Sequence, residues 1–208
     1  MNWLEQFRER TSRRGTPPPR PPEEDGVFER SSPGLASFFA GLTEDGRHSI
    51  LDLGPAQNSH LELLGRYGRR IRFAGLVPTP PRAEGLMRAL RSIAPAGEGA
   101  YDAVLAWDVF DRLSETERRA VATRLVELTA DGARLYTVVD SSGVQVSRPV
   151  RLTLAGPDRV RRAPAGAVTE AGSPFLPAHV ERMLAPFEVV QAISLKGGFR
   201  EYVAIRRE

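Results

Sequence analysis

The stretch His48-Ser-Ile-Leu-Asp-Leu-Gly-Pro-Ala-Gln-Asn-Ser-His60 decides the predicted fold. Its apolar run from Ile50 to Leu53, interrupted only by Asp52, is typical of a strand buried on both faces of a parallel sheet. A turn of small residues follows. Ser59 and Glu62 have the spacing of a capping box, which predicts that a helix begins there. A strand, a tight turn and a helix N-terminus in this order let a ligand approach the backbone and its unpaired N–H groups.

The composition indicates one domain of ordinary size. The 208 residues, of which 41% are hydrophobic, suffice for a single core. The absence of cysteine excludes disulfides and thiolate zinc sites. No apolar run is long enough to predict a membrane span, and the N-terminus has no apolar signal core, so we expect a cytoplasmic protein. The net charge is only +3, so a nucleic-acid partner is conceivable but not favoured.

Two segments precede the predicted domain. Residues 1–14 are expected to form a short amphipathic helix, which either docks on its own domain or contacts a protein partner. Residues 15–30 are predicted to be a linker, because adjacent prolines favour an extended chain and forbid a helix. The domain itself is placed at residues 31–208, with an inserted hairpin region at 140–172.

The rest of the chain alternates between helical and strand patterns. Apolar residues at helical spacing predict helices near residues 31–42, 61–67, 86–93, 115–129 and 174–185. Apolar runs predict strands near residues 71–77, 103–106, 133–139, 187–195 and 199–205. This order predicts an α/β, Rossmann-like fold with a mostly parallel central sheet, helices on both faces and a C-terminal antiparallel hairpin.

The opening stretch resembles the first motif of the class I S-adenosylmethionine-dependent methyltransferases. That motif is an acid, any residue, and then glycines at alternating positions. Here it stands as Asp52-Leu-Gly54-Pro-Ala56-Gln-Asn58, so the first glycine is kept and the next two are replaced. The resemblance implies that S-adenosylmethionine binds beside Asp52, Gly54, Ala56 and Asn58, at the carboxyl end of the first strand.

The end of the predicted second strand departs from the resembled family. There an acid closes the strand and binds the ribose hydroxyls of the cofactor, because a carboxylate can accept two hydroxyl hydrogen bonds at once. The corresponding residue here is Val77, which cannot accept a hydrogen bond. Residues 94–100 read as a loop where the family usually has its third strand. We therefore expect that strand to be absent or vestigial.

Residues 101–113, Tyr-Asp-Ala-Val-Leu-Ala-Trp-Asp-Val-Phe-Asp-Arg-Leu, resemble the fourth-strand motif of the same family. Asp108 follows the predicted strand, where it either contacts the cofactor's methionine end or the substrate, or caps the turn. Trp107 is expected to be a cleft wall or a packing residue. Ser114 and Glu117 form a second capping box, so another helix is predicted to begin there.

A hairpin is predicted after the fifth strand, because Val150, Leu152 and Leu154 alternate before a turn. The segment from Arg148 to Arg162 holds five arginines against one acid. It is either a solvated edge hairpin whose charges prevent edge pairing, or a site for an anionic substrate or nucleic acid. In the resembled family, insertions at this point often cover the substrate, and a closing antiparallel hairpin marks the fold.

Few residues point to a catalytic group. The histidines His48, His60 and His179 are not at metal-ligand spacing, so no metal site is predicted. Methyl transfer from a sulfonium depends mainly on alignment of nucleophile, methyl and sulfur. The resemblance therefore names no catalytic residue, although His60 is a candidate general base.

Two hypotheses follow from the sequence. The first is an S-adenosylmethionine-dependent methyltransferase whose small-molecule or protein acceptor is unknown. The second is a non-catalytic protein that kept the fold as a partner-binding or scaffold module. They differ in one expectation. A cofactor requires a nucleoside-sized space beside Gly54, whereas side chains such as Val77 or Trp107 in that space would favour the second hypothesis.

Overall fold

The computed structural model describes most of the predicted domain, namely residues 27–76, 83–93, 100–141, 146–147, 150–164, 169–170, 177–185 and 187–207. The predicted N-terminal helix and most of the proline-rich linker lie outside the described residues. So do Val77 and residues 94–99, and the expectation of a missing third strand therefore stays a prediction.

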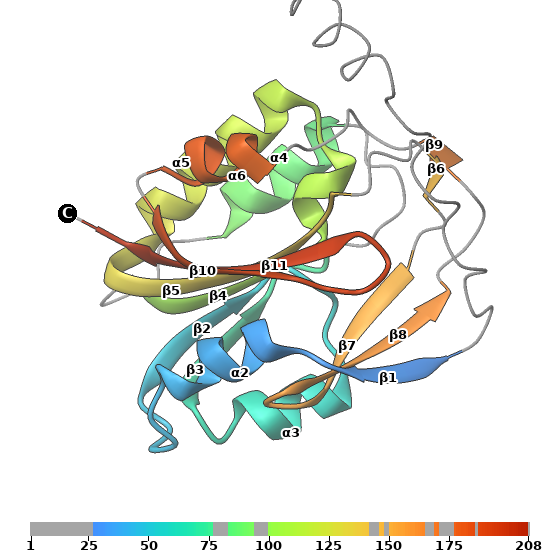
Figure 1. Cartoon of the computed structure of the whole chain (residues 1–208). Coiled ribbons are helices and arrows are strands. Elements are labelled where there is room, and N and C mark those ends of the chain that lie inside the picture. Colours follow the sequence, from blue (N-terminus) through green and yellow to red (C-terminus); the bar gives the residue numbers. More distant parts are fainter. Residues whose placement is uncertain are drawn as a thin grey trace, which may run out of the picture.

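The centre of the molecule is a six-stranded sheet with the order β10-β11-β5-β4-β2-β3. Strands β3, β2, β4 and β5 are parallel, whereas β11 and β10 add an antiparallel hairpin at one edge. This confirms the predicted α/β fold with a mostly parallel sheet and a closing hairpin (Figure 1). The bounds are β2 His48–Asp52, β3 Gly68–Phe73, β4 Tyr101–Trp107, β5 Thr129–Asp140, β10 Phe187–Ser194 and β11 Phe199–Arg206.

Helices cover both faces of this sheet (Figure 1). One face carries α4 Ala83–Ser92, α5 Glu115–Leu128 and α6 Pro177–Leu184, and the other carries α2 Pro33–Ala40 and α3 Asn58–Leu64. A short 3-10 helix, η1 Val109–Arg112, links β4 to α5. Alternate residues of the strands feed two separate cores: Leu51 and Val104 pack towards α5, whereas Ile50 and Leu105 pack towards α2 and α3. None of the described helices has both the length and the apolar character that a membrane span requires.

The two predicted capping boxes have opposite outcomes. Ser114 accepts from the N–H of Glu117, and Glu117 accepts in return from the N–H of Ser114, so the box that opens α5 is confirmed. The box predicted at Ser59 is wrong, because the N-cap of α3 is Gln57, two residues earlier, and it makes no side-chain hydrogen bond. Of the apolar residues that predict a helix near 61–67, Leu64 and Tyr67 are buried, but Leu61 is 47% exposed.

Two predicted strands have different bounds. The second strand, β3, begins at Gly68 and ends at Phe73, before the predicted end at residue 77. Strand β5 begins at Thr129, directly after α5. The residues expected between the helix at 115–129 and the strand at 133–139 instead form an irregularity inside this strand, where Gly132 adopts a left-handed φ of 80°.

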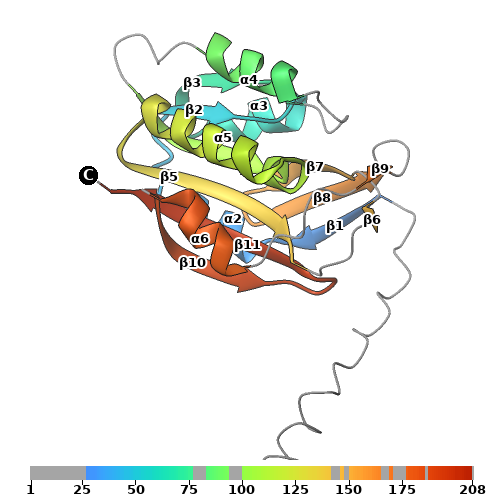
Figure 2. The same cartoon turned by 90° about the horizontal axis from the view of Figure 1, so that it is seen from above.

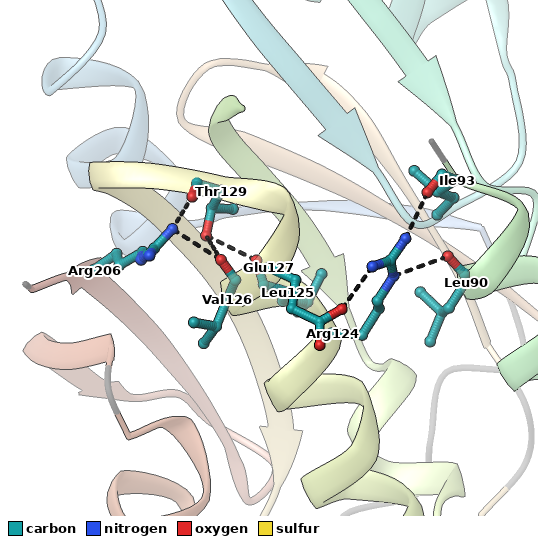
Figure 3. Close-up of polar contacts among 8 residues, drawn as sticks. All are labelled: Leu90, Ile93, Arg124, Leu125, Val126, Glu127, Thr129 and Arg206. Carbon is teal, nitrogen blue, oxygen red and sulfur yellow. Dashed lines mark hydrogen bonds and ion pairs between the residues drawn. The ribbon is translucent and has the colours of Figure 1, made fainter. Parts of the chain in front are cut away.

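Arginine side chains close the C-terminal ends of α4 and α5 (Figure 3). Arg124 donates to the carbonyl of Ile93 at 2.9 Å, and Arg206 donates to the carbonyls of Val126 and Thr129. Helix C-termini leave carbonyl groups without intrahelical partners, and cations placed there also interact favourably with the helix dipole. Arg124 of α5 therefore ties the end of α4 to α5, and Arg206 of β11 ties the end of α5 to the sheet, so both have a structural role.

The predicted hairpin is confirmed as β7 Val150–Gly156 and β8 Arg159–Pro164. Only β7 is an edge strand of this hairpin, because β8 also pairs with β1 Phe28–Ser31. The three strands make a sheet of order β1-β8-β7. We call these three strands the small sheet. Residues 28–30 belong to the stretch that the sequence assigns to the linker, but here they form part of a paired strand. Two further short strands, β6 Val146–Ser147 and β9 Thr169–Glu170, pair with each other.

The small sheet lies on the same side of the central sheet as α2 and α3 (Figures 1 and 2). Leu154 and Val160 of the small sheet share one buried cluster with Trp107 and Tyr136 of the central sheet. Strand β7 also contacts α3. The inserted hairpin therefore covers the carboxyl-end region where the sequence places the candidate site.

Candidate functional site

Asp52 is the last residue of β2, and its carboxylate is completely buried. One carboxylate oxygen, Oδ1, accepts from the backbone N–H of Gly54 at 2.7 Å and from the indole Nε1–H of Trp107 at 2.6 Å. The other oxygen, Oδ2, lies 2.7 Å from Nδ1 of His60. A buried carboxylate is costly unless it is hydrogen-bonded. These three donors therefore make Asp52 the centre of a closed network at the carboxyl end of the strand.

The contact at the second ring nitrogen of His60 decides which of the two nitrogens carries the proton. The backbone N–H of Leu154 lies 3.0 Å from Nε2, and a backbone amide can only donate, so Nε2 accepts. Nδ1 is then the protonated nitrogen and donates to Asp52. His60 is fully buried and both of its ring nitrogens are engaged. It therefore joins the inserted hairpin to β2, and the candidate role as a general base has no exposed nitrogen to support it.

Trp107 ends β4 with a left-handed φ of 51°, which is uncommon for a bulky residue. Its carbonyl accepts from the hydroxyl of Thr137 at 2.7 Å, which helps to hold this conformation. The indole is 4% exposed and stacks on the ring of His60, with 5.3 Å between centroids. A side-chain carbon built on Gly54 would lie 3.2 Å from the indole nitrogen. The indole therefore rests directly on Gly54, where a cofactor bound beside this glycine would need open space.

The six predicted cofactor residues do not surround one cavity. Asp52 and Gly54 are buried within the hydrogen-bonded network just described. Ala56 and Asn58 are exposed on the loop and on the first turn of α3. Val77 lies outside the described residues. Asp108 follows β4 and lines a pocket, which contains none of the other five.

That pocket, with a cavity volume of about 30 Å³, lies between the small sheet and the central sheet. On the central sheet it is lined by Tyr136 and Val138 of β5 and by Phe199 and Glu201 of β11. On the opposite wall it is lined by residues of β1, β7 and β8.

A second buried carboxylate, Glu201, forms the inner part of this pocket. It is 1% exposed and accepts from the hydroxyls of Ser32 and Tyr136 and, at 2.8 Å, from the N–H of Gly34. Ser32 is also the N-cap of α2, where its hydroxyl accepts from Leu35 N–H. Burial, and then the neighbouring Glu201 carboxylate, raise the pKa of Tyr136 well above its usual value, so the phenol remains a donor. Glu201 thus anchors α2 to β11.

A third carboxyl, Asp111 of η1, has fewer donors. It accepts from the N–H of Asp140 at 2.9 Å. Burial raises the pKa of Asp111 to about 8, and the Asp108 carboxylate adds to this shift. The side chain is therefore largely protonated at neutral pH. Within the described part of the chain, no cluster of histidines and carboxylates is arranged to hold a metal ion, so the predicted absence of a metal site remains a prediction.

Sequence reasoning missed most of the residues around the pocket. Arg30 lies in the predicted linker, and Glu201 and Tyr136 lie in strands whose patterns indicate only burial. One signal was present: Glu201 interrupts the apolar residues of the last strand, and an acid at an inward-facing strand position requires a partner. Its partners, Ser32 and Tyr136, are far away in sequence and could not be named without the fold.

The chain is similar in fold to S-adenosylmethionine-dependent methyltransferases over about 85% of its length. The N-methyltransferase NodS from Bradyrhizobium japonicum is 17% identical and has a TM-score of 0.49, with 84% of this chain and 94% of NodS covered. The methyltransferase CcbJ from Streptomyces caelestis is 14% identical and has a TM-score of 0.46, with 84% and 94% covered. The glycopeptide N-methyltransferase MtfA, in complex with (S)-adenosyl-L-homocysteine, is 16% identical and has a TM-score of 0.45, with 85% and 90% covered.

No family model and no curated protein match the sequence. At identities below 20% and TM-scores below 0.5, the likeness to these enzymes extends to architecture and carries nothing about ligands. What this chain binds has to be argued from its own residues.

Proposed function

We propose that this protein is a non-catalytic module of methyltransferase-like fold, which binds a partner or ligand without using S-adenosylmethionine. The observation that carries this proposal is the closed network around Asp52. All three donors of the network are supplied by the protein itself, and the indole of Trp107 rests on Gly54. The carboxylate of Asp52 and the indole of Trp107 therefore lie directly against Gly54, the first glycine of the resembled motif.

The residues around this corner do not fit the cofactor. A nucleoside needs a concave, accessible surface, but Gly54 is covered and His60 is locked between Asp52 and Leu154. Opening the corner would leave buried donors of Trp107 and His60 without an acceptor, at a cost of about 1–3 kcal/mol each. The replacement of the ribose-binding acid by Val77 points in the same direction.

Calorimetric titration with S-adenosylmethionine and with S-adenosylhomocysteine tests this proposal. We expect no saturable heat at ligand concentrations up to about 1 mM, which would place any dissociation constant above the micromolar range. The indole N–H resonance of Trp107 supplies a local readout, because that proton donates to Asp52. It should not shift when either ligand is added. Saturable micromolar binding together with a shift of this resonance would overturn the proposal.

An S-adenosylmethionine-dependent methyltransferase of unknown acceptor is the second candidate function. Two observations favour it. The side-chain amide nitrogen of Gln57, in the loop after β2, is buried and has no hydrogen-bond partner among the residues that the structure describes. Asp108, at the carboxyl end of β4, faces the pocket between the sheets. For this function the indole of Trp107 must leave Gly54 when the cofactor binds, so the titration above separates the two candidates.

A further inference from the structure

We propose that the outer edge of β3 binds an extended acidic segment of a partner protein, which adds to the central sheet as a further strand. The inference rests on the proposed function, a partner-binding module, and names the surface that receives the partner and the chemistry that the partner needs. Strand addition of this kind combines backbone hydrogen bonds, which supply affinity, with side-chain contacts, which supply specificity.

Strand β3 is the outermost strand of the central sheet on the side opposite β10 (Figure 2). Among the described strands it pairs only with β2, in parallel. Every residue of β3 is at least partly exposed, whereas four of the five residues of β2 are buried. Within the described part of the chain, the N–H and C=O groups on the far side of β3 therefore have no ladder partner, which makes this edge a template for another strand.

The two faces of β3 have different neighbours. Ile71 and Phe73 pack against the apolar cluster that contains Leu63 and Leu64 of α3. Alternate residues of a strand share one face, so Arg69 lies on this α3 face and Arg72 lies on the opposite one. The helix on that opposite side, α4, packs mainly against α5. Each face of the edge strand thus presents one exposed arginine.

The charges of Arg69 and Arg72 are not matched within the described chain. No described carboxylate lies within ion-pair distance of either guanidinium. The exposed acid Glu62, on the adjacent α3, forms no ion pair with them. A guanidinium can hold a carboxylate in a bidentate pair. A strand that adds to this edge with one acid on each face would supply a partner to both arginines.

The same charges oppose pairing between two copies of this chain. In an antiparallel, two-fold pair of β3 strands, residues directly opposite each other point to the same face. Two registers pair nearly the whole strand. In one of them the two copies of Arg70 lie opposite each other, and in the other Arg70 lies opposite Arg72. Like charges in directly opposite positions are destabilising, so the edge disfavours its own copies and favours an acidic strand.

A nucleic acid would meet the arginines but has no peptide groups to pair with the edge. An acidic peptide matches both the charges and the open backbone groups, so it is the partner that the two features select together.

A matched set of eight-residue peptides tests this assignment. The first carries two glutamates three positions apart among valines and threonines, which reproduces the spacing of Arg69 and Arg72. The second has lysine in place of each glutamate. The third keeps both glutamates but has proline at its two central positions, where proline removes N–H donors and disrupts strand pairing.

Binding of each peptide to the full chain is followed by the resonance shifts and the hydrogen-exchange protection of the β3 amides. We expect saturable binding of the first peptide, with slower exchange of these amides, because added backbone hydrogen bonds protect them. The lysine peptide and the proline peptide should each bind about tenfold more weakly or worse.

Charge reversal then locates the ionic contacts. The double variant Arg69→Glu/Arg72→Glu should weaken binding of the glutamate peptide about tenfold and should bind the lysine peptide in its place. The matched control is Arg159→Glu on the small sheet, because Arg159 is also exposed and has no ion pair among the described residues. This control should change binding less than about twofold, since exposed charges beyond the screening length have little effect. The thermal unfolding midpoint of each variant shows that it is folded.

Four results would each overturn the proposal: no saturable binding of the glutamate peptide, equal binding of its proline form, unchanged binding after the double charge reversal, or equal shifts of the β3 amides with oligothymidylate, a single-stranded nucleic acid. The titration with S-adenosylmethionine is read at the indole of Trp107, whereas these results are read at β3. The two proposals can therefore fail separately.

Discussion

Asp52 and Glu201 are two buried carboxylates that the same fold uses differently. Both lie on the face of the central sheet that α2, α3 and the small sheet cover, and each accepts three hydrogen bonds. Among the described residues, neither has an arginine or lysine as an ion-pair partner. Asp52 closes a corner of the molecule, whereas Glu201 borders an open pocket.

The difference lies in the donors. Asp52 receives its bonds from three nitrogens, and none of these can accept in return. Two of the three donors to Glu201 are hydroxyls, of Ser32 and Tyr136, which can reverse their roles by rotating a proton. The position of the Asp52 side chain therefore requires a group that only accepts hydrogen bonds. At Glu201 the two hydroxyls can turn to accept a hydrogen bond, so a side chain that also donates can be accommodated.

The largest effect should come from Asp52→Asn. The new amide would direct N–H groups at a nitrogen donor, and His60 cannot respond by changing tautomer because Nε2 must accept from Leu154. We expect a loss of about 3 kcal/mol in the free energy of unfolding, since buried donors lose their acceptor. Urea denaturation followed by circular dichroism measures it.

The control for this change is Asp131→Asn, because the Asp131 side chain is 56% exposed and its ion pair with Arg206 lies at the surface. We expect Asp131→Asn to lower the free energy of unfolding by less than about 0.5 kcal/mol. A loss below about 1 kcal/mol for Asp52→Asn would show that the network is not rigid.

The next effect concerns Asp111, a partly buried carboxyl that accepts, within the described residues, from the backbone N–H of Asp140. The unfolded carboxyl has a pKa near 3.8 and the folded one about 8, so the native state holds an extra proton between these values. Stability should therefore fall as the pH rises from about 4 to 8. Asp111→Asn removes this titration, so the variant should gain roughly 2 kcal/mol relative to the parent between pH 5 and about pH 6.5.

Denaturant midpoints measured at several pH values would test the Asp111 prediction. The same gain at pH 5 as at pH 8 would contradict it, because an effect of packing alone does not depend on pH. If the prediction holds, the number of donors decides which buried carboxyls of this fold can remain charged.

The smallest effect is expected for Glu201→Gln. The amide oxygen can accept from Gly34 N–H, and the hydroxyls of Ser32 and Tyr136 can rotate to accept from the amide nitrogen. We expect a loss of about 1 kcal/mol, from weaker hydrogen bonds rather than unsatisfied groups. Denaturation under the same conditions as for Asp52→Asn gives the comparison, and equal losses for the two variants would remove the distinction between the networks.

The sequence predicted the architecture well because local patterns determine it. Apolar periodicity located the helices and strands, and the capping box at Ser114 marked the start of α5 correctly. The box at Ser59 failed because spacing alone cannot tell whether a hydroxyl faces the helix N-terminus. The start of β5 was misplaced because Gly132 adopts its left-handed conformation inside a strand and does not end one.

The site was less predictable because its contacts join distant parts of the chain. Asp52, His60 and Trp107 were all noted in the sequence, but no spacing rule indicates that they bond to one another. Leu154, which fixes the tautomer of His60, lies 94 residues further along the chain. The predicted cofactor residues were chosen by motif position, and burial of Gly54 beneath an indole has no sequence signature.

Strand β1 also sets an order of events during synthesis of the chain. The ion pair between Glu29 and Arg161 spans 132 residues, so β1 has no partner until most of the chain has left the ribosome. Contacts of such long sequence separation form slowly, and an unpaired strand edge is exposed to other chains in the meantime. The pocket wall that contains Arg30 can therefore be completed only after β8 has been synthesised. Slow translation between these two segments would prolong the period in which nascent chains can aggregate.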